Sequence, residues 1–200
     1  MRSLRKLGVL AILALALSAF GAANASADSE FTFSATGSLE GKALTAQVFH
    51  TAGGTVECTS AKTTGTIEKV TFTEQKMAVQ YSGCTAFGFT NVKINPAEYL
   101  FTTHTVEAQL INSVHVLNTI TIDVPAAVCR VTVQPQTVGT VSFETIKATG
   151  TTTNIKQKSN VTGIKYTSSG GFCGASGENG AYTGENEVFR VGGGSVAFDP

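Results

Sequence analysis

The sequence predicts an all-β fold: an antiparallel β-sandwich, or flattened barrel, of about a dozen strands stapled by disulfides. Three observations support this. The 200 residues include 29 Thr with abundant Val, Phe and Gly, and β-branched residues suit a half-buried pleated surface. Short segments of alternating apolar and polar residues recur, and no long stretch keeps the 3.6-residue period of a helix. Four cysteines are typical of an exported domain that forms disulfides.

Residues 1–27 are predicted to be a secretory signal peptide. A basic start precedes an uncharged apolar run over residues 7–20, and small residues follow. The run of 14 residues is shorter than the roughly 20 that a spanning helix needs, which disfavours a membrane anchor. Cleavage before Asp28 fits the small side chains that signal peptidase requires, and cleavage before Ser26 fits equally well on side-chain size. We therefore expect a secreted, extracellular protein.

The mature chain, residues 28–200, is predicted to be a single all-β domain. Three of the 14 basic residues lie in the signal peptide, so 11 Lys and Arg remain against 14 Asp and Glu, a formal charge of −3. These charges are scattered and form no basic stripe, which excludes nucleic acid as an expected partner. No later segment approaches 18 consecutive apolar residues, so no membrane span is expected in the mature form.

In the first half of the domain, alternating segments are separated by turn residues. Val56 and Cys58 lie two apart, so both side chains face one side of their strand. Two hairpins are expected, one turning near residues 74–75 and a longer one turning near residues 112–113. The expected strands are 31–35, 44–49, 56–58, 66–73, 77–81, 87–94 and 99–110.

The second half of the domain continues the same pattern, and no helix is expected in either half. Cys129, Val131 and Val133 alternate with polar residues and therefore share one strand face. The expected strands are 114–124, 128–133, 138–148, 152–158, 161–167 and 182–191.

Two segments share an order of residues that predicts an internal duplication, with repeat units of about 55–95 and 127–190. Each contains a cysteine, a Gly-Thr-β-branched step, an apolar-x-Tyr-hydroxyl step and a second cysteine. The loops differ in length, and coincidence within a composition rich in Thr, Gly and Val is the alternative. Four cysteines allow three pairings. We predict Cys58–Cys84 and Cys129–Cys173, because each bridge then closes one unit.

The sequence also resembles a known group of proteins. The segments that carry the likeness are residues 81–89 (YSGCTAFGF), 129–137 (CRVTVQPQT) and 182–184 (YTG). They look like a group of uncharacterised secreted bacterial all-β proteins, and the likeness spans most of the mature chain. Members of that group carry a further cysteine pair near Pro96 and near Val116, and this chain has no cysteine in either region. The resemblance implies no particular activity.

Histidines offer one candidate metal site. His104 and His115 would face each other across a hairpin turning near residue 112, and with Glu98 they would form a two-His, one-carboxylate zinc site. Isolated histidines on strands are more often surface or hydrogen-bonded residues. His104 and Glu107 lie three apart, and on a strand such residues point to opposite faces. We therefore expect no metal ligands and no cofactor.

Other catalytic patterns are missing from the sequence. It contains no G-x-S-x-G, and cysteines held in disulfides offer no thiol nucleophile. The acidic, Gly-rich stretch 177–187 could offer oxygens to Ca²⁺, but it matches no calcium-binding motif. We expect it to be a turn-rich hairpin with solvated carboxylates. No catalytic or cofactor-binding residue is therefore predicted.

The expected function is a secreted, non-enzymatic β-domain, a structural or binding module at the cell exterior with an unidentified extracellular or cell-surface ligand. A secreted hydrolase built on a β-sandwich is the alternative, because fold does not determine function. Convergence of His104, His115 and an acid in a pocket would favour the hydrolase. Separation of the two histidines on solvent-exposed faces would favour the binding module.

Overall fold

The computed structural model describes residues 29–106 and 109–200, and it confirms the all-β prediction. In these residues the chain forms sixteen strands, paired antiparallel, and one short 3-10 turn at Pro125–Ala127. The strands are β1 (Glu30–Phe33), β2 (Gly37–Ala43), β3 (Gln47–Thr51), β4 (Gly54–Ile67), β5 (Thr71–Phe72), β6 (Glu74–Ala86), β7 (Lys93–Ile94), β8 (Ala97–Val106), β9 (Gln109–Val116), β10 (Ile120–Val124), β11 (Cys129–Val133), β12 (Gln136–Val138), β13 (Val141–Lys147), β14 (Thr153–Gly170), β15 (Gly177–Arg190) and β16 (Val196–Asp199).

The strands form one large and one small sheet. The large sheet has thirteen strands; its main path runs β12-β9-β8-β6-β4-β2-β15-β14-β11-β10-β7, and β3 and β13 pair beside this path. The small sheet has the order β16-β1-β5, so the first and last strands of the domain pair with each other. The small sheet closes one end of the molecule.

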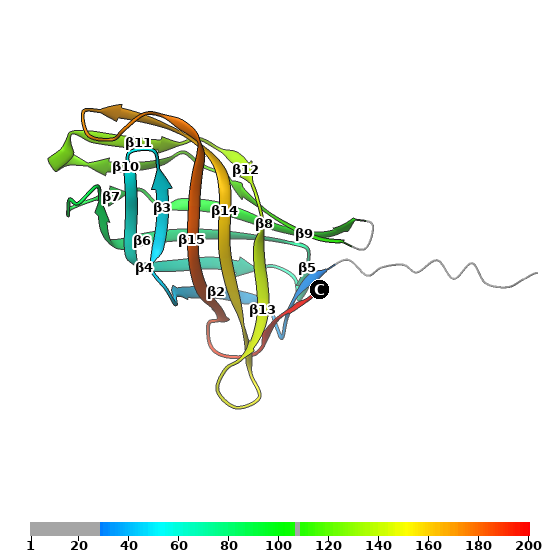
Figure 1. Cartoon of the computed structure of the whole chain (residues 1–200). Helices are drawn as coiled ribbons and strands as arrows, with labels where there is room; N and C mark the ends of the chain where they lie inside the picture. Colours follow the sequence, from blue (N-terminus) through cyan, green and yellow to red (C-terminus); the bar gives the residue numbers. More distant parts are fainter. Residues whose placement is uncertain (1–28, 107–108) are drawn as a thin grey trace, which may run out of the picture.

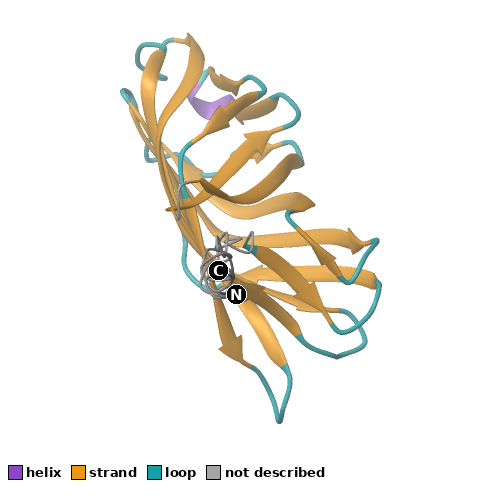
Figure 2. Ribbon diagram, turned by 90° about the vertical axis from the view of Figure 1, so that its right-hand side faces the viewer, coloured by secondary structure: helices purple, strands orange, loops and turns teal. Residues whose placement is uncertain are grey.

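Long strands fold the large sheet into two layers. β4 pairs with β3 along its first residues and with β2 along its last, and β15 also pairs with both β3 and β2. β14, with 18 residues, pairs with β13 and then with β11. In Figure 1, β3, β14 and β15 run nearly perpendicular to β6, β8 and β9. Figure 2 shows the same layers from the side, joined by short loops. Such crossed layers enclose a core between their inner faces.

Both expected hairpin turns lie at other residues. β8 and β9 pair up to Val106 opposite Gln109, and residues 112–113 lie within the paired part of β9, so the hairpin does not turn there. The two residues between Val106 and Gln109 lie outside the described residues. Asn112 lies inside β9 because its buried amide donates a hydrogen bond to the Val141 carbonyl. The turn expected at 74–75 is also wrong, because β6 already begins there and the chain between β4 and β6 includes β5, which pairs with β1.

Several strand boundaries differ from expectation. β14 joins the expected strands 152–158 and 161–167, and its pairing with β15 shifts register around Gly163, whose φ of +75° favours glycine. The expected strand 87–94 is mostly loop: Lys93–Ile94 forms the short strand β7, and Phe89 makes an isolated bridge to Ala86. β2 and β16 form where no strand is expected. The sequence signal at β2 was hidden by glycine, which is read as a break.

Both predicted disulfides are confirmed. Cys58 and Cys84 lie opposite each other on β4 and β6, with their Cα atoms 3.9 Å apart. Cys129 on β11 is joined to Cys173 in the loop after β14, with a Cα separation of 5.3 Å. The first bridge crosses a strand pair and the second ties a strand to a loop. The internal duplication stays a prediction.

The inward strand faces form the core, and the predicted faces are confirmed. Val56 and Cys58 are both buried, as are Cys129, Val131 and Val133. Beneath the small sheet the core is a cluster of phenylalanine rings, which we call the phenylalanine cluster: Phe31, Phe33, Phe72, Phe143 and Phe198. No helix in the described part of the chain is long and apolar enough to cross a membrane.

Candidate functional site

The two histidines that would flank a metal ion lie far apart along their strands. His104 on β8 is opposite Ile111, whereas His115 on β9 is opposite Leu100. Four residues of strand separate these positions, about 13 Å. Glu98, the third expected ligand, forms an ion pair of 2.7 Å with a lysine of β6. The zinc-site hypothesis is therefore wrong, because in the register of this hairpin the two histidines do not face each other.

The histidines have separate surroundings. His115 Nδ1 lies 2.8 Å from Thr137 Oγ1, and His50 Nδ1 lies 3.2 Å from Thr55 Oγ1. The side chain of His104 is exposed. Within residues 29–106 and 109–200, no group of three His, Cys, Asp or Glu side chains could hold a metal ion.

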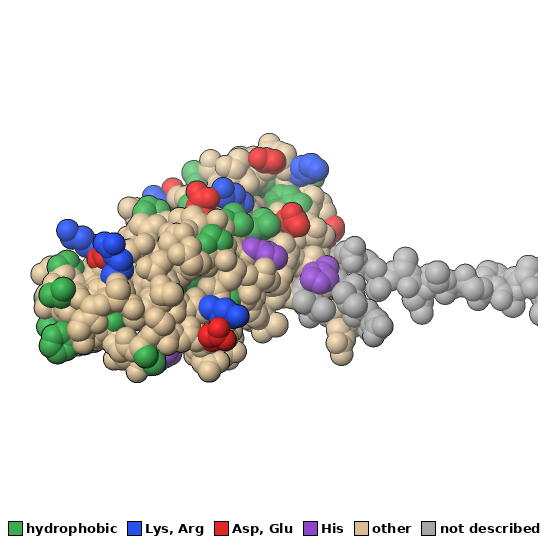
Figure 3. Space-filling model, turned by 90° about the horizontal axis from the view of Figure 1, so that it is seen from above, with side chains coloured by type: hydrophobic (Ala, Val, Ile, Leu, Met, Phe, Trp, Pro, Cys, Tyr) green, Lys and Arg blue, Asp and Glu red, His purple; other side chains and the backbone are tan. Residues whose placement is uncertain are grey.

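The acidic stretch 177–187 is not a turn-rich hairpin but most of β15. Its carboxylates lie close to lysines of other strands: Glu187 is 3.0 Å from Lys42, and Glu185 is 3.9 Å from Lys158. The acids therefore do not gather around a common point. Figure 3 shows the same for the visible surface, where acidic and basic side chains are interspersed and most of the area is uncharged.

A cavity of about 100 Å³ lies between the two layers, away from the small sheet. Of its 21 lining residues, 14 are apolar, and none is Asp, Glu, Lys, Arg or His. One wall comes from β6, β8 and β9, and the facing wall comes from β3, β14 and β15. Side chains of β4, β7, β10, β11 and β12 complete the lining. The space is a mostly apolar chamber without formal charge.

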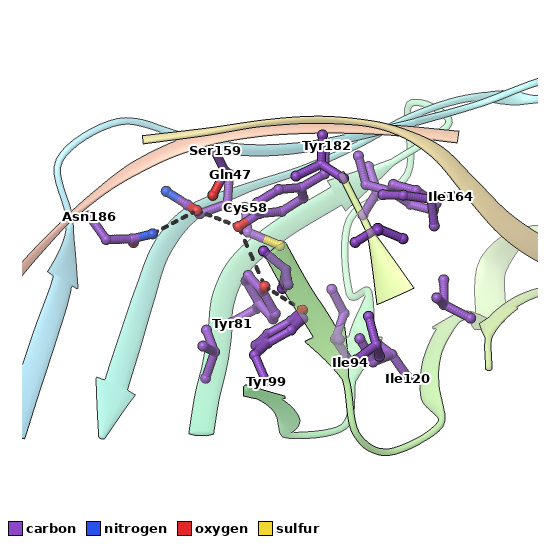
Figure 4. A pocket seen from close by; sticks show the side chains of 18 of the residues that line it. Gln47, Cys58, Tyr81, Ile94, Tyr99, Ile120, Ser159, Ile164, Tyr182 and Asn186 are labelled. Carbon is purple, nitrogen blue, oxygen red and sulfur yellow. Dashed lines mark hydrogen bonds between the residues drawn. The ribbon is translucent and has the colours of Figure 1, made fainter. Parts of the chain in front are cut away.

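Five of the seven polar side chains of the cavity form one cluster, shown in Figure 4, which we call the tyrosine cluster: Gln47, Tyr81, Tyr99, Tyr182 and Asn186. The other two, Gln157 and Ser159, are hydrogen-bonded to each other. The hydroxyl oxygens of Tyr81 and Tyr99 are 3.0 Å apart, and those of Tyr81 and Tyr182 are 3.4 Å apart. The Tyr182 hydroxyl donates to Gln47 Oε1 at 2.5 Å. Three phenols from three strands therefore meet end to end inside the domain.

Gln47 anchors this cluster to the backbone. Its Nε2 atom donates to the carbonyls of Thr45 at 2.8 Å and Glu185 at 3.3 Å. The side chain reaches its position only because residue 184 is glycine, since a Cβ there would lie 2.3 Å from Gln47 Oε1. Asn186 Nδ2 also faces Gln47 Oε1, at 3.5 Å.

Burial keeps the three phenols uncharged. It is the largest cause that raises the pKa of Tyr81 and of Tyr99 well above the ordinary value of 10.0, and it also raises the pKa of Tyr182. The repulsion that a second phenolate would bring raises each pKa further. The cavity therefore presents neutral hydroxyls at physiological pH, not phenolate nucleophiles or bases.

Sequence reasoning missed this site. Gln47 shares its strand face with Phe49, and Asn186 shares its face with Val188, so both amides occupy inward positions where alternation favours apolar residues. A buried polar residue on an otherwise apolar face needs a partner, and that need points to other polar groups inside the domain. This signal was present in both strands.

A scan against protein-family models, a search of curated proteins and a search of solved structures gave no match to this chain.

Proposed function

We propose that the protein is a non-catalytic binding module of the cell exterior that holds a small neutral molecule in the cavity between its layers. The observation that carries this proposal is the lining itself, an uncharged and mostly apolar wall with a few hydrogen-bonded polar groups. Small-molecule sites have this composition, because apolar walls supply most of the affinity and a few polar groups orient the ligand.

The size of the cavity limits the ligand. Its volume is about 100 Å³. An apolar protein cavity of roughly 150 Å³ takes up benzene. The proposed ligand is therefore a molecule of about the size of a single six-membered ring or a short branched chain.

Two features support a binding role outside the cytoplasm. The disulfides Cys58–Cys84 and Cys129–Cys173 are of a kind that persists in oxidising compartments, in keeping with the secretory pattern of residues 1–27. The histidines lie apart and outside the cavity lining, so no acid–base pair is assembled there. The hydrolase alternative gains no support from this arrangement.

Toluene is a suitable probe, because its ring matches the proposed ligand size. Added at ten times its Kd to the oxidised mature protein, it is expected to raise Tm by about 3–6 °C. Benzoate, which has a similar shape and a negative charge, is expected to leave Tm unchanged, since an unpaired charge is strongly disfavoured in an apolar site. Methyl NMR shifts of Val116 and Ile122 would place bound toluene in the cavity.

A matched pair of variants tests the location. Val161 is buried and lines the cavity, so Val161→Phe is expected to fill it and remove the toluene response. Val48 lies on the outward face of β3, between Gln47 and Phe49, so Val48→Phe makes the same chemical change outside the cavity and should keep the response. Absence of any toluene effect on Tm and on the methyl spectrum of the unaltered protein would overturn the binding role.

A further inference from the structure

We infer that the ligand of this cavity is a neutral hydrogen-bond donor, a compact phenol or alcohol, whose hydroxyl donates a hydrogen bond to the hydroxyl oxygen of Tyr99. This inference rests on the proposed binding function and names the class of molecule that the tyrosine cluster selects. It follows from the direction of the hydrogen bonds in the cluster.

The direction of these hydrogen bonds is determined by the Gln47 side chain. Its Nε2 atom donates to two backbone carbonyls, those of Thr45 and Glu185, and carbonyls only accept. The amide oxygen must therefore be the atom that faces Tyr182. Since that oxygen carries no hydrogen, the Tyr182 hydroxyl has to donate to it.

The donor in each of the two tyrosine pairs then follows in turn. A phenol has one proton, and the proton of Tyr182 is used on Gln47, so Tyr182 can only accept from Tyr81. The proton of Tyr81 is thereby used as well, and Tyr99 must donate to Tyr81. The chain of donors runs Tyr99 to Tyr81 to Tyr182 to Gln47.

Tyr99 is consequently the open end of the chain. Among the described residues, its hydroxyl makes a single hydrogen bond, the one to Tyr81, and no group donates to its oxygen. The ring is partly buried, packs against the core and lines the cavity. A hydroxyl that donates into a chain of hydrogen bonds becomes a stronger acceptor, because the chain polarises it.

The acceptor at Tyr99 excludes two classes of ligand. An ether or a ketone would bring a second acceptor against the Tyr99 oxygen and form no hydrogen bond with it. An ammonium could donate, but all 21 lining side chains are without formal charge and none would balance it. A neutral hydroxyl on a small apolar body satisfies both the acceptor and the walls.

Three probes of similar shape separate this inference from the binding function: toluene, fluorobenzene and phenol. Affinities are measured on the oxidised mature protein and divided by each probe's partition coefficient from water into an alkane. After this correction, phenol is expected to bind about tenfold or more tightly than toluene. Fluorobenzene has no hydrogen-bond donor, so its corrected affinity should equal that of toluene. If none of the three binds, the binding function fails. If toluene binds and phenol shows no excess, only the inference about the donor fails.

Variants test the role of the tyrosines. Tyr99→Phe alone passes the free acceptor to Tyr81, and adding Tyr81→Phe passes it to Tyr182. The decisive variant is therefore the triple change of Tyr81, Tyr99 and Tyr182 to Phe, in which no phenol acceptor remains and Gln47 Oε1 keeps the Asn186 amide. It should remove the excess affinity for phenol and leave toluene binding intact. Tyr166→Phe is the control, because Tyr166 bonds the Ala52 amide outside the cavity lining. An undiminished excess for phenol in the triple variant would overturn the inference, and the unaltered protein's probe series decides it if that variant fails to fold.

Discussion

At the end of the domain beneath the small sheet, the five rings of the phenylalanine cluster fill the space between the layers, with neighbouring centroids 4.9–6.4 Å apart. Only a void of about 30 Å³ remains there. At the other end, three tyrosines meet by their hydroxyls and about 100 Å³ stays open. Phe101 and Gln157 line both spaces and mark the boundary between them.

The difference shows how one pair of layers can be solid at one end and hollow at the other. β1, β5 and β16 bring rings into the phenylalanine cluster from outside the large sheet, whereas the tyrosine cluster comes entirely from the large sheet. A buried phenol needs a hydrogen-bond partner for its hydroxyl, so the tyrosine rings are fixed by hydrogen bonds at their hydroxyl groups and not by close packing along their faces. The first end supplies stability and the second leaves room for a ligand.

Truncating the phenylalanine cluster is the largest expected effect. Phe31 is 3% exposed and contacts three other rings, so Phe31→Ala should lower the free energy of unfolding by about 4 kcal/mol. Phe172, which is 69% exposed, is the control, and Phe172→Ala should change stability by less than about 0.5 kcal/mol. Chemical denaturation measures both. Equal losses for the two variants would show that the cluster is not the stable end.

The disulfides belong to the hollow end. Cys58 lines the cavity, and Cys129 lies on β11, which supplies Val133 to the lining. Replacing both cysteines of either pair by Ala should cost about 3.5–4 kcal/mol, because the unfolded chain regains the freedom of a loop of 26 or 44 residues. Denaturation of each double variant under oxidising conditions measures the loss. A loss below about 1 kcal/mol would mean that strand packing alone holds the cavity end together.

Local patterns were enough to predict the strand faces and both disulfides, but they could not predict the cavity. Val56 and Cys58 are two residues apart, and a period of two places them on one face wherever the strand lies. Tyr182 and Gln47 are 135 residues apart, and their contact depends on β3 pairing with β15. The hairpin turn was misplaced for the same reason, because the hydrogen-bond partner of the buried Asn112 amide is the Val141 carbonyl, which is distant in sequence.

The tyrosine cluster should make the protein sensitive to alkaline pH. In the unfolded chain the phenols lose their protons near pH 10, whereas burial keeps the pKa of Tyr81, Tyr99 and Tyr182 above that value in the folded state. The folded protein then binds more protons, so stability is complete below pH 10 and falls as the pH rises above it. The slope is at most about 1.4 kcal/mol per pH unit for each phenol that stays protonated.

Unfolding by denaturant at a series of pH values, monitored with phenolate absorbance, measures this decline. Replacing Tyr81 by Phe should make the decline less steep, because one proton fewer distinguishes the two states. Normal titration of all the phenols in the folded protein, before any loss of structure, would contradict the burial of the cluster.

The smallest expected effects distinguish the three tyrosines from one another and test the direction of their hydrogen bonds. Tyr182→Phe should cost about 2 kcal/mol, because Gln47 Oε1 then keeps only the Asn186 amide at 3.5 Å and is left as a poorly satisfied buried acceptor. Tyr99→Phe removes one hydrogen bond at the open end and orphans no donor, since the proton of Tyr81 is still used on Tyr182; it should cost about 1 kcal/mol or less. If the chain ran the other way, Tyr99 would be the acceptor for Tyr81, and its loss would leave a buried proton without a partner. A Tyr99→Phe variant less stable than Tyr182→Phe in matched denaturation curves would therefore show the reverse direction.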